Sequence, residues 1–243
     1  MRVPLRSLSV RWSSLGAALA FSVLRLSTAN AAQPAPPVDV TTCGQVVTGA
    51  GRLVADLDCT GQAGLSMSAA IMVRHHGSLD LDGHTLIAGP GAAAVACGAL
   101  CKDGVNYCEG DCTIYGGTIT VPTATGILGR NVMLHDVTVT VNTWGVIASR
   151  KLTIMDSTIG GSDYVEVEGR WIKIYRSTLI GSGLAGISTA PRNSSLKLFE
   201  STVSGHQCDL STWRLPRLHD SSCASSCGGG HDGLGPWGVC TDD

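Results

Sequence analysis

The sequence predicts an all-β protein folded as one solenoid of stacked parallel coils. A short phrase of alternating apolar and polar residues recurs about every twenty residues, as in VMLHDVTVT (132–140), KLTIMDSTIG (151–160) and IKIYRSTLI (172–180). Gly, Asp and Ser stand at the corners of these phrases, and the 243-residue chain contains 31 glycines. The ten cysteines lie outside the central repeats. A fixed period of this length is the signature of a repeat architecture.

Residues 1–31 are predicted to be a secretory signal peptide. Arg2, Arg6 and Arg11 precede the apolar run LGAALAFSVL, and small residues form a cleavage site up to Ala31. A membrane anchor is the alternative, but the run is shorter than the ~20 apolar residues that span a bilayer. We therefore expect a secreted mature chain without a transmembrane segment, extracellular or periplasmic, with retention at the cell surface as a further option. Residues 32–42 are expected to be a Pro-rich spacer, and 43–243 the folded domain.

The cysteines are expected to form disulfides at the two ends and in one insertion. Cys43 and Cys59 lie near the start, an insertion at 90–111 holds Cys97, Cys101 and Cys108 next to Cys112, and a C-terminal cap at 208–243 holds four more. An even number in an exported chain indicates disulfides. A tetrahedral zinc site is the alternative for the insertion. Each group of four permits three pairings, and the sequence leaves the choice open.

The period predicts which residues stack from coil to coil. One apolar column is expected to contain Ile114, Leu134, Ile154, Ile174, Leu198 and Leu218, at steps of twenty residues with one of twenty-four. Further inward columns are Cys112, Val132, Leu152, Ile172 and Leu196; Ile119, Val139, Ile159, Leu179 and Val203; and Ile127, Ile147, Val167 and Ile187. An outward column is Thr118, Thr138, Thr158, Thr178 and Thr202. Apolar residues two apart, interrupted by turn residues, indicate several short strands per coil.

A coil of twenty residues has room for three strands around a filled interior. At ~3.3 Å per residue its contour is about 66 Å, and equivalent residues of successive coils would stack ~4.8 Å apart. A leucine-rich repeat is the rival architecture. It requires a helical return segment and an Asn or Cys turn, whereas both halves of each repeat here resemble strands. The pattern therefore favours about seven coils of β-solenoid.

Two stretches resemble a known family. The segment SLDLDGHTLIAG (78–89), after the entry segment between Cys43 and Cys59, resembles the first coil of exported bacterial right-handed parallel β-helix proteins of the pectin-lyase-like superfamily, and PWGVC (236–240) resembles an ending of such chains. The resemblance covers about residues 40–240 and implies a single-stranded right-handed parallel β-helix. It implies an extracellular carbohydrate as partner, because the superfamily contains polysaccharide lyases, hydrolases, epimerases and adhesins. A shared fold does not identify an activity.

A cationic stripe is expected at one corner of the coils. Arg130, Arg150 and Arg170 fall on successive coils, with Lys151 beside them and Arg192 close by. Guanidinium groups suit the carboxylates of an acidic polysaccharide. A solvated turn with splayed side chains is the alternative interpretation. The formal charge of −2 argues against nucleic acid as a partner, because nucleic-acid binding needs a basic surface.

Carboxylates gather at two further places. Asp136 and Asp156 would be adjacent at one corner, where they could hold Ca²⁺, raise one another's pKa, or form a salt bridge with Arg176. Glu166 and Glu168 are both expected to face water, since Val165 and Val167 define the inward side. His75 and His76 are expected to be a polar corner rather than metal ligands.

An outward column of rings follows the inward Ile column. It contains Tyr115, His135, Met155, Tyr175, Phe199 and His219. Flat exposed faces in a row suit stacked sugar rings, and unburied apolar surface often marks an interaction site. The alternative is that the N-terminal segment or the 90–111 insertion covers the column.

The sequence therefore predicts a secreted protein that binds extracellular or cell-surface carbohydrate without catalysis. The alternative is a polysaccharide lyase or a related uronate enzyme that works by Arg- or Lys-assisted β-elimination. No motif maps residue by residue onto a catalytic set of the superfamily, and no cofactor follows from the sequence. In the lyase hypothesis Arg150, Arg170 and Lys151 are the catalytic candidates, and Asp136 and Asp156 would hold Ca²⁺. Arg130, Tyr115, His135, Tyr175 and Phe199 would bind the polysaccharide.

Overall fold

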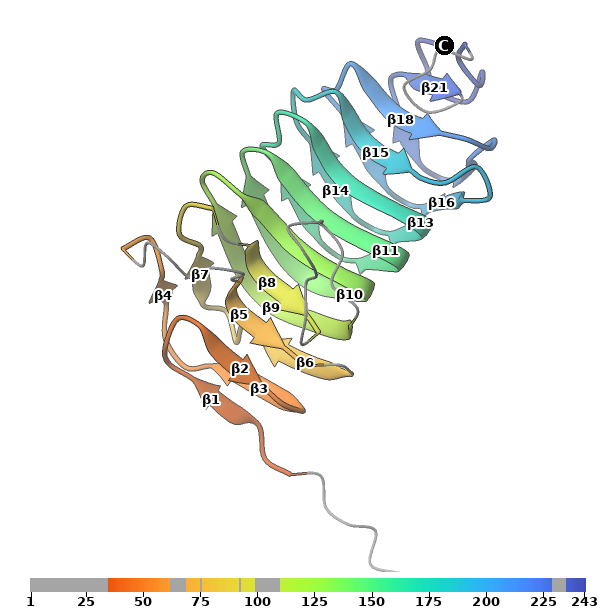
Figure 1. The fold of residues 1–243 in the computed structure, drawn as a ribbon. Coiled ribbons are helices and arrows are strands. Elements are labelled where there is room, and N and C mark those ends of the chain that lie inside the picture. Colours follow the sequence, from red (N-terminus) through yellow and green to blue (C-terminus); the bar gives the residue numbers. More distant parts are fainter. Residues whose placement is uncertain (1–34, 62–68, 75, 92, 99–109, 229–234) are drawn as a thin grey trace, which may run out of the picture. The chain divides into compact units, whose positions relative to one another are not determined.

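The chain forms a right-handed parallel β-helix of about seven coils (Figure 1). A computed structural model describes residues 35–243 except for 62–68, 75, 92, 99–109 and 229–234. All regular structure in these residues is β-strand, and every strand pairing is parallel. The predicted signal peptide lies outside the described residues. No helix of the described part is long and apolar enough to cross a bilayer.

Each coil contributes strands to three faces, which we name in chain order. The first face contains β2 (Gln45–Val47), β5 (Ala69–Val73), β8 (Ala93–Cys97), β15 (Ala185–Thr189), β18 (Cys208–Thr212) and β21 (Ser226–Gly228). The second face contains β1 (Val38–Val40), β3 (Ala50–Leu53), β6 (Gly77–Asp80), β16 (Ser195–Phe199) and β19 (Arg217–His219). The third face contains β4 (Leu57–Asp58), β7 (Thr85–Ile87), β12 (Thr158–Gly160), β14 (Thr178–Ile180), β17 (Thr202–Ser204) and β20 (Ser222–Cys223).

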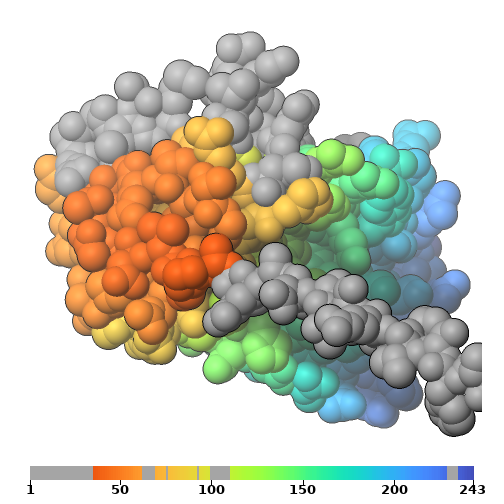
Figure 2. Space-filling model, turned by 90° about the horizontal axis from the view of Figure 1, so that it is seen from below, coloured from red at the N-terminus to blue at the C-terminus, as the bar shows by residue number. Residues whose placement is uncertain are grey.

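Four long strands pass through corners and join the faces. They are β9 (Asp111–Val121), β10 (Thr125–Val141), β11 (Trp144–Met155) and β13 (Val165–Tyr175). All 21 strands of the described residues therefore belong to one continuous sheet wound around the core. In the space-filling view the colours follow the chain from the orange coils toward the blue ones, because each coil adds to the end of the stack (Figure 2).

The inward columns pack as predicted. Leu134 pairs with Ile114 on one side and with Ile154 on the other, and Leu198 pairs with Ile174 and Leu218. These side chains, apart from the half-buried Leu218, have no exposed surface. The outward column of Thr118, Thr138, Thr158, Thr178 and Thr202 is also in register. Vertical stacking of residues twenty apart is therefore confirmed.

One predicted column is wrong by a single position. Ile127 stacks on Val146, and Val146 stacks on Val167, so Val146 rather than Ile147 points into the core. The coil that leads to Val146 contains one residue fewer than the period of twenty. Register returns at a bulge, where Ser149 and Arg150 stand opposite Arg130 alone. A one-residue slip reverses the side on which a strand side chain lies, which is why counting by twenty failed here.

The corner between the second and third faces has a left-handed residue in every coil from β6 onward. Positive φ angles of 44° to 56° occur at Asp136, Asp156, Arg176, Glu200 and Asp220. The next residue in the last four coils is a serine. Ser177 Oγ accepts a hydrogen bond from Ser157 N at 3.1 Å and donates to Tyr175 O at 2.7 Å. Ser157, Ser201 and Ser221 repeat this pattern, so a serine ladder satisfies the backbone where the chain turns.

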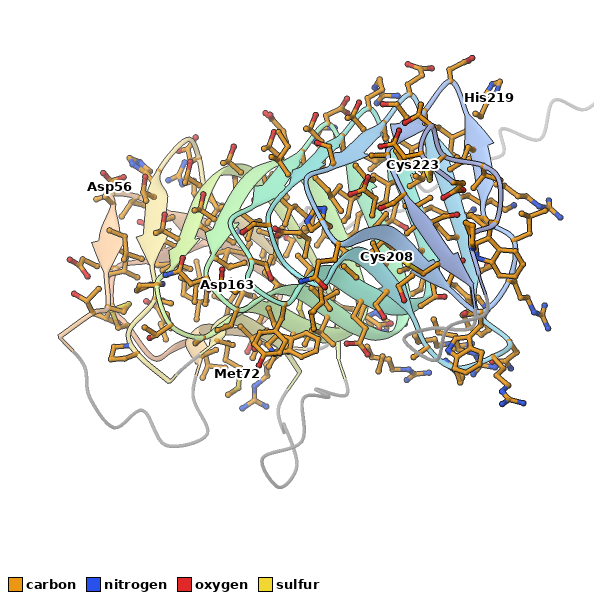
Figure 3. All side chains as sticks on the ribbon, turned by 90° about the horizontal axis from the view of Figure 1, so that it is seen from above. Asp56, Met72, Asp163, Cys208, His219 and Cys223 are labelled. Atoms are coloured by element: carbon orange, nitrogen blue, oxygen red, sulfur yellow. A yellow bond between two sulfur atoms is a disulfide. The ribbon has the colours of Figure 1, made fainter. Side chains whose placement is uncertain are left out.

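Disulfides hold the ends of the described chain. Cys43 pairs with Cys59 at the start, Cys97 with Cys112 on neighbouring strands, and Cys208–Cys227 and Cys223–Cys240 close the C-terminal end (Figure 3). Cys101 and Cys108 lie outside the described residues. The predicted boundaries differ in two places, because β1 forms within the 32–42 spacer and β8 within the 90–111 insertion, each as an ordinary strand of a coil.

Candidate functional site

Most of the predicted binding residues lie together on the outward surface of the second face. Strand alternation points three side chains per coil outward, and each joins a column along the stack. The first corner joins the first and second faces, and the second corner joins the second and third faces. The column nearest the second corner is the predicted ring column. In the middle column the later coils carry Lys173, Lys197 and Arg217, which pair in register. The column nearest the first corner contains Asp111, Asn131, Lys151, Trp171 and Ser195.

Positive charge is concentrated on this surface. From the β10 coil to the β19 coil, the outward strand positions on the second face carry four Lys or Arg side chains: Lys151, Lys173, Lys197 and Arg217. The same positions carry no Asp or Glu. Carboxylates appear only where the chain turns into the third face, at Asp136, Asp156, Glu200 and Asp220. The outer surface of the second face is therefore suited to anionic ligands.

The ring column forms stacked contacts in the C-terminal half. Tyr175 and Phe199 are stacked, with ring centroids 4.7 Å apart and an interplanar angle of 6°. His219 meets the edge of Phe199 at 6.0 Å and projects away from the coils (Figure 3). His135 has 51% of its side chain exposed, whereas Tyr115, Tyr175 and Phe199 are half-buried. Residues 99–109, part of the insertion that is one of the two segments considered as a cover for this column, lie outside the described residues.

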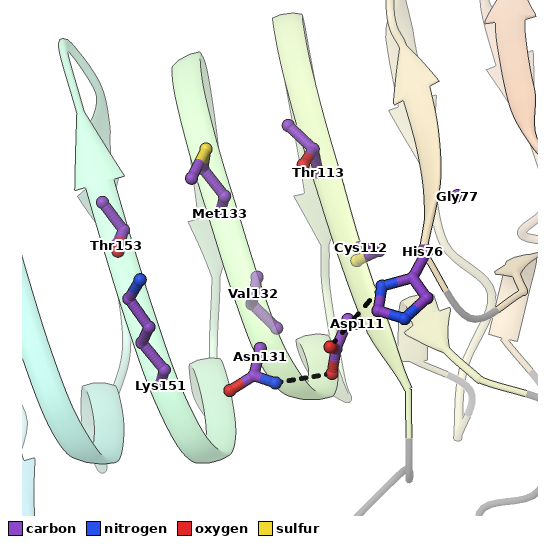
Figure 4. A pocket seen from close by; sticks show the side chains of 10 residues that line it. All are labelled: His76, Gly77, Asp111, Cys112, Thr113, Asn131, Val132, Met133, Lys151 and Thr153. Carbon is purple, nitrogen blue, oxygen red and sulfur yellow. Dashed lines mark hydrogen bonds and ion pairs between the residues drawn. The ribbon is translucent and has the colours of Figure 1, made fainter.

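A pocket of about 230 Å³ opens on the same surface toward the N-terminal coils (Figure 4). Polar groups follow one side of it from rung to rung. Asn131 Nδ2 donates to Asp111 Oδ1 at 2.7 Å, and His76 Nδ1 lies 3.7 Å from Asp111 Oδ2. Lys151 continues this side on the next coil, and Met133 and the threonines 113 and 153 line the other. His76 therefore belongs to the surface, while His75 lies outside the described residues.

The predicted cationic stripe is held against aromatic rings at the first corner. The guanidinium carbons of Arg150 and Arg170 lie 5.5 Å and 4.6 Å from the ring centroid of Trp171. Arg192 lies 5.1 Å from the ring of Trp213 in the same way. Arg130 stands on this corner one coil earlier. Arg150, Arg170 and Arg192 therefore lie over indole rings rather than splaying apart.

The structure does not bring the candidate base and the candidate metal ligands together. Arg150 and Lys151 begin the second-face strand of β11, and Asp156 follows its end, five residues or about 16 Å further on. Arg176 Nε and Nη2 donate to the two carboxylate oxygens of Asp156 at 2.7 and 2.8 Å. These hydrogen bonds lower the pKa of Asp156.

The donor set at this corner does not fit a calcium site. Both carboxylate oxygens of Asp156 already accept from Arg176, which leaves Asp136 as the one remaining carboxylate of the predicted pair. No group of three or more His, Cys, Asp or Glu side chains in the described residues is placed to hold a metal ion. Of the roles considered for this pair, the salt bridge with Arg176 is the one that the contacts show.

The prediction for Glu166 is wrong, because its side chain is fully buried. Glu166 Oε1 accepts from Ser162 N at 2.9 Å and lies 3.6 Å from His206 Nε2. His206 Nδ1 lies 3.3 Å from Asp209 Oδ1, and all three side chains have no exposed surface. Burial opposes the charged imidazole, but the hydrogen bonds to Asp209 and Glu166 outweigh it and raise the pKa of His206 to about 9. This buried triad is a structural element away from the site.

Two features of this surface were not predicted from the sequence. The middle column of Lys173, Lys197 and Arg217 follows the same register as the Ile column and could have been found by the same counting. The pocket around Asp111 and Asn131 could not, because one of its walls comes from β6, which precedes the insertion.

No protein-family model, curated protein sequence or solved structure matches the chain.

Proposed function

We propose that this protein is exported and binds an acidic polysaccharide along the outer surface of its second face, without catalysis. Membership of the exported bacterial pectin-lyase-like β-helix proteins is part of this proposal. The observation that carries it is the composition of that surface, where four cations and a column of rings lie on consecutive coils without a carboxylate among them. Disulfides in the described chain support an oxidising, extracytoplasmic location.

The geometry suits a linear ligand that runs along the coils. Successive rungs stack ~4.8 Å apart, so each coil can offer one cation to a carboxylate and one ring edge to a sugar. Lys173 and Lys197 provide adjacent charges, and Tyr175 and Phe199 present adjacent outer ring edges, since their faces are stacked on each other. Lys151 and the pocket beside Asn131 extend this surface toward the N-terminal coils. Arg130, Tyr115 and His135 complete the proposed contacts.

Affinity electrophoresis tests the proposal with purified protein in gels that contain polygalacturonate, alginate or uncharged dextran. We expect retardation by the two acidic polymers, less retardation at high salt, and none with dextran. The double variants Lys173→Gln/Lys197→Gln and Tyr175→Ala/Phe199→Ala should each weaken retardation at least tenfold. The matched control is Thr158→Ala/Thr178→Ala on the third face. Equal migration in all gels contradicts polysaccharide binding.

The same polymers test the lyase alternative, in which Arg150, Arg170 or Lys151 would act as base. Release of unsaturated uronate ends, followed by absorbance with and without added Ca²⁺, would replace the binding proposal with an enzymatic one. The separation of Asp156 from Arg150, and its pairing with Arg176, support the proposal of binding over that of catalysis.

A further inference from the structure

We propose that the first corner of the β-helix is a docking ridge for an anionic phospholipid membrane surface. The ridge consists of Arg150, Arg170, Trp171, Arg192, Trp213 and Arg214, which come from four consecutive coils. It lies at the edge of the proposed polysaccharide surface and goes beyond that function, since it involves a different partner. In this arrangement the protein would rest on a membrane through the ridge and present its second face to the surroundings.

Contacts within the ridge hold three of its four guanidinium groups over indole rings. Trp171 has guanidinium groups of two coils near its ring, at 4.6 Å and 5.5 Å from the centroid. Trp213 has the guanidinium of Arg192 at 5.1 Å, and Trp213 N donates to Thr189 Oγ1 at 3.3 Å. Arg214 Nε donates to Arg192 O at 3.2 Å, which ties the last two coils of the ridge together. The ridge is thus an ordered row.

Charge along the ridge has one sign. The corner segments 149–150, 170–171, 190–194 and 213–216 contain four cations and no carboxylate: Arg150, Arg170, Arg192 and Arg214. The acidic residue nearest in sequence is Glu168, which lies on the first face and lines a neighbouring depression with Ser149 and Pro191. Four cations spread over four rungs match an extended anionic surface, because every coil can contribute at the same time.

Aromatic and aliphatic groups among these cations favour a lipid surface over a dissolved polymer. Trp is enriched where membranes meet water, since its indole is apolar with one polar end. Leu215 stands between Arg214 and Arg217 with 59% of its surface exposed, and such a side chain gains from contact with lipid rather than water. Arg side chains beside an indole can bind headgroup phosphates while their stems lie along apolar surface.

Vesicle co-sedimentation tests the proposal. Purified protein is mixed with vesicles of phosphatidylglycerol and phosphatidylcholine, or of phosphatidylcholine alone, at low and high salt. We expect binding to the anionic vesicles that weakens at high salt, no binding to the zwitterionic ones, and a blue shift of Trp emission on binding. Absence of sedimentation with anionic vesicles at low salt overturns the proposal.

Variants separate the ridge from the rest of the protein. Each cation near an anionic membrane strengthens binding about fivefold, so Arg192→Gln/Arg214→Gln should weaken vesicle binding about twenty-fivefold. The matched control Arg52→Gln/Arg176→Gln removes the same charge from outside the ridge and should bind vesicles as the unmodified protein does. Equal loss in both double variants overturns the ridge as the site.

A last comparison distinguishes this proposal from polysaccharide binding. Relative to a gel without polymer, the ridge variant should be retarded by polygalacturonate as much as the unmodified protein, and Lys173→Gln/Lys197→Gln should lose retardation in that gel far more than vesicle binding. A ridge variant that loses gel retardation but keeps vesicle binding would assign the ridge to the polysaccharide and overturn the membrane proposal. If the unmodified protein binds anionic vesicles but is not retarded in the polygalacturonate gel, only the proposed polysaccharide binding is contradicted.

Discussion

At the scale of single residues, the buried triad of Glu166, His206 and Asp209 is the most consequential arrangement away from the site. Glu166 and Asp209 occupy equivalent positions two coils apart, and Gly186 takes that position on the coil between them. His206 fills the space that the glycine leaves and contacts both carboxylates. Asp209 also accepts from Ala224 N at 2.7 Å, so the triad links the last three coils. A buried charge of this kind is tolerated because it is paired.

The triad makes stability depend on pH. The pKa of His206 is raised from 6.5 in the unfolded chain to about 9 in the folded one, so the stabilisation is complete below about pH 6.5 and lost as pH rises through 9. The loss should be on the order of 3 kcal/mol. Urea unfolding at several pH values between 6 and 9.5 measures it. His206→Gln should be less stable at pH 6 and nearly independent of pH in this range; an equally steep dependence in this variant would contradict the prediction.

Gly181 leaves room for the triad. A Cβ at this position would lie 2.8 Å from His206 Nε2 and would also meet Glu166 Oε1. Gly181→Ala should therefore lower the free energy of unfolding by about 2–4 kcal/mol, because it displaces buried paired charges. Gly61→Ala is the control, since nothing lies within 4 Å of a Cβ there. Thermal unfolding of the two variants side by side measures the difference, and similar melting temperatures would show that the triad can shift without cost.

At the scale of elements, the serine ladder explains how each coil turns between its second and third faces. Ser177 Oγ both accepts from Ser157 N and donates to Tyr175 O, so one hydroxyl satisfies two backbone groups. The residue immediately before each of these serines has a left-handed conformation, so the backbone at that point cannot continue ordinary strand pairing. The backbone conformation at this turn thus explains why a charged residue followed by Ser and Thr recurs in the sequence.

Removing one hydroxyl of the ladder should be measurable. Ser177→Ala leaves the buried Ser157 N–H without its acceptor, and we expect a loss of about 1–3 kcal/mol in the free energy of unfolding. Thr178→Ala, at the next and half-exposed position, removes a hydroxyl from the surface and should change stability by less than about 0.5 kcal/mol. Chemical denaturation of both variants checks the contrast. Equal effects would mean that the hydroxyl of the ladder is replaced by water.

The same elements show how far the pattern could be read from sequence. The Leu134, Ile154 and Ile174 column was predictable because side chains in a strand alternate and the period is constant. Val146 takes the inward position predicted for Ile147 because the coil lacks one residue before Val146 and regains it at the bulge. The two changes cancel over the coil, so counting by whole coils does not reveal them. Of the site residues, the ring column shared this predictable register. The environment of Arg150 and Arg170 was not predictable, since Trp171 lies in a different column.

At the scale of the whole molecule, the β-helix is a linear stack in which each coil contacts mainly its neighbours. Stability in such a molecule is close to a sum of coil terms and nearest-neighbour terms. Unprotected ends therefore fray first. Here the C-terminal end is closed by Cys223–Cys240 and by Asp243, whose carboxylate accepts from the backbone N–H groups of Ser226, Val239 and Cys240.

Loss of the terminal disulfide should therefore act locally. Cys223→Ser/Cys240→Ser opens a loop with a sequence separation of 17 and should cost about 3 kcal/mol. Hydrogen exchange should accelerate in β18–β21 and remain unchanged in β5–β9. Cys43→Ser/Cys59→Ser is the mirror control and should affect β2–β5 instead. Uniform acceleration along the whole stack in either variant would show that the coils unfold as one cooperative unit.

The sequence by itself determined the all-β solenoid, the stacking of residues twenty apart and the identity of the outward ring column, because strand alternation and a constant period are local properties. Only the tertiary structure decided that Asp156 belongs to Arg176, that Glu166 is buried with His206 and Asp209, and that the arginines lie on indoles. Those contacts depend on side-chain direction at corners and on a one-residue bulge. Neither the side-chain directions nor the bulge follows from the period of the sequence, since side chains at a corner do not alternate regularly between inward and outward.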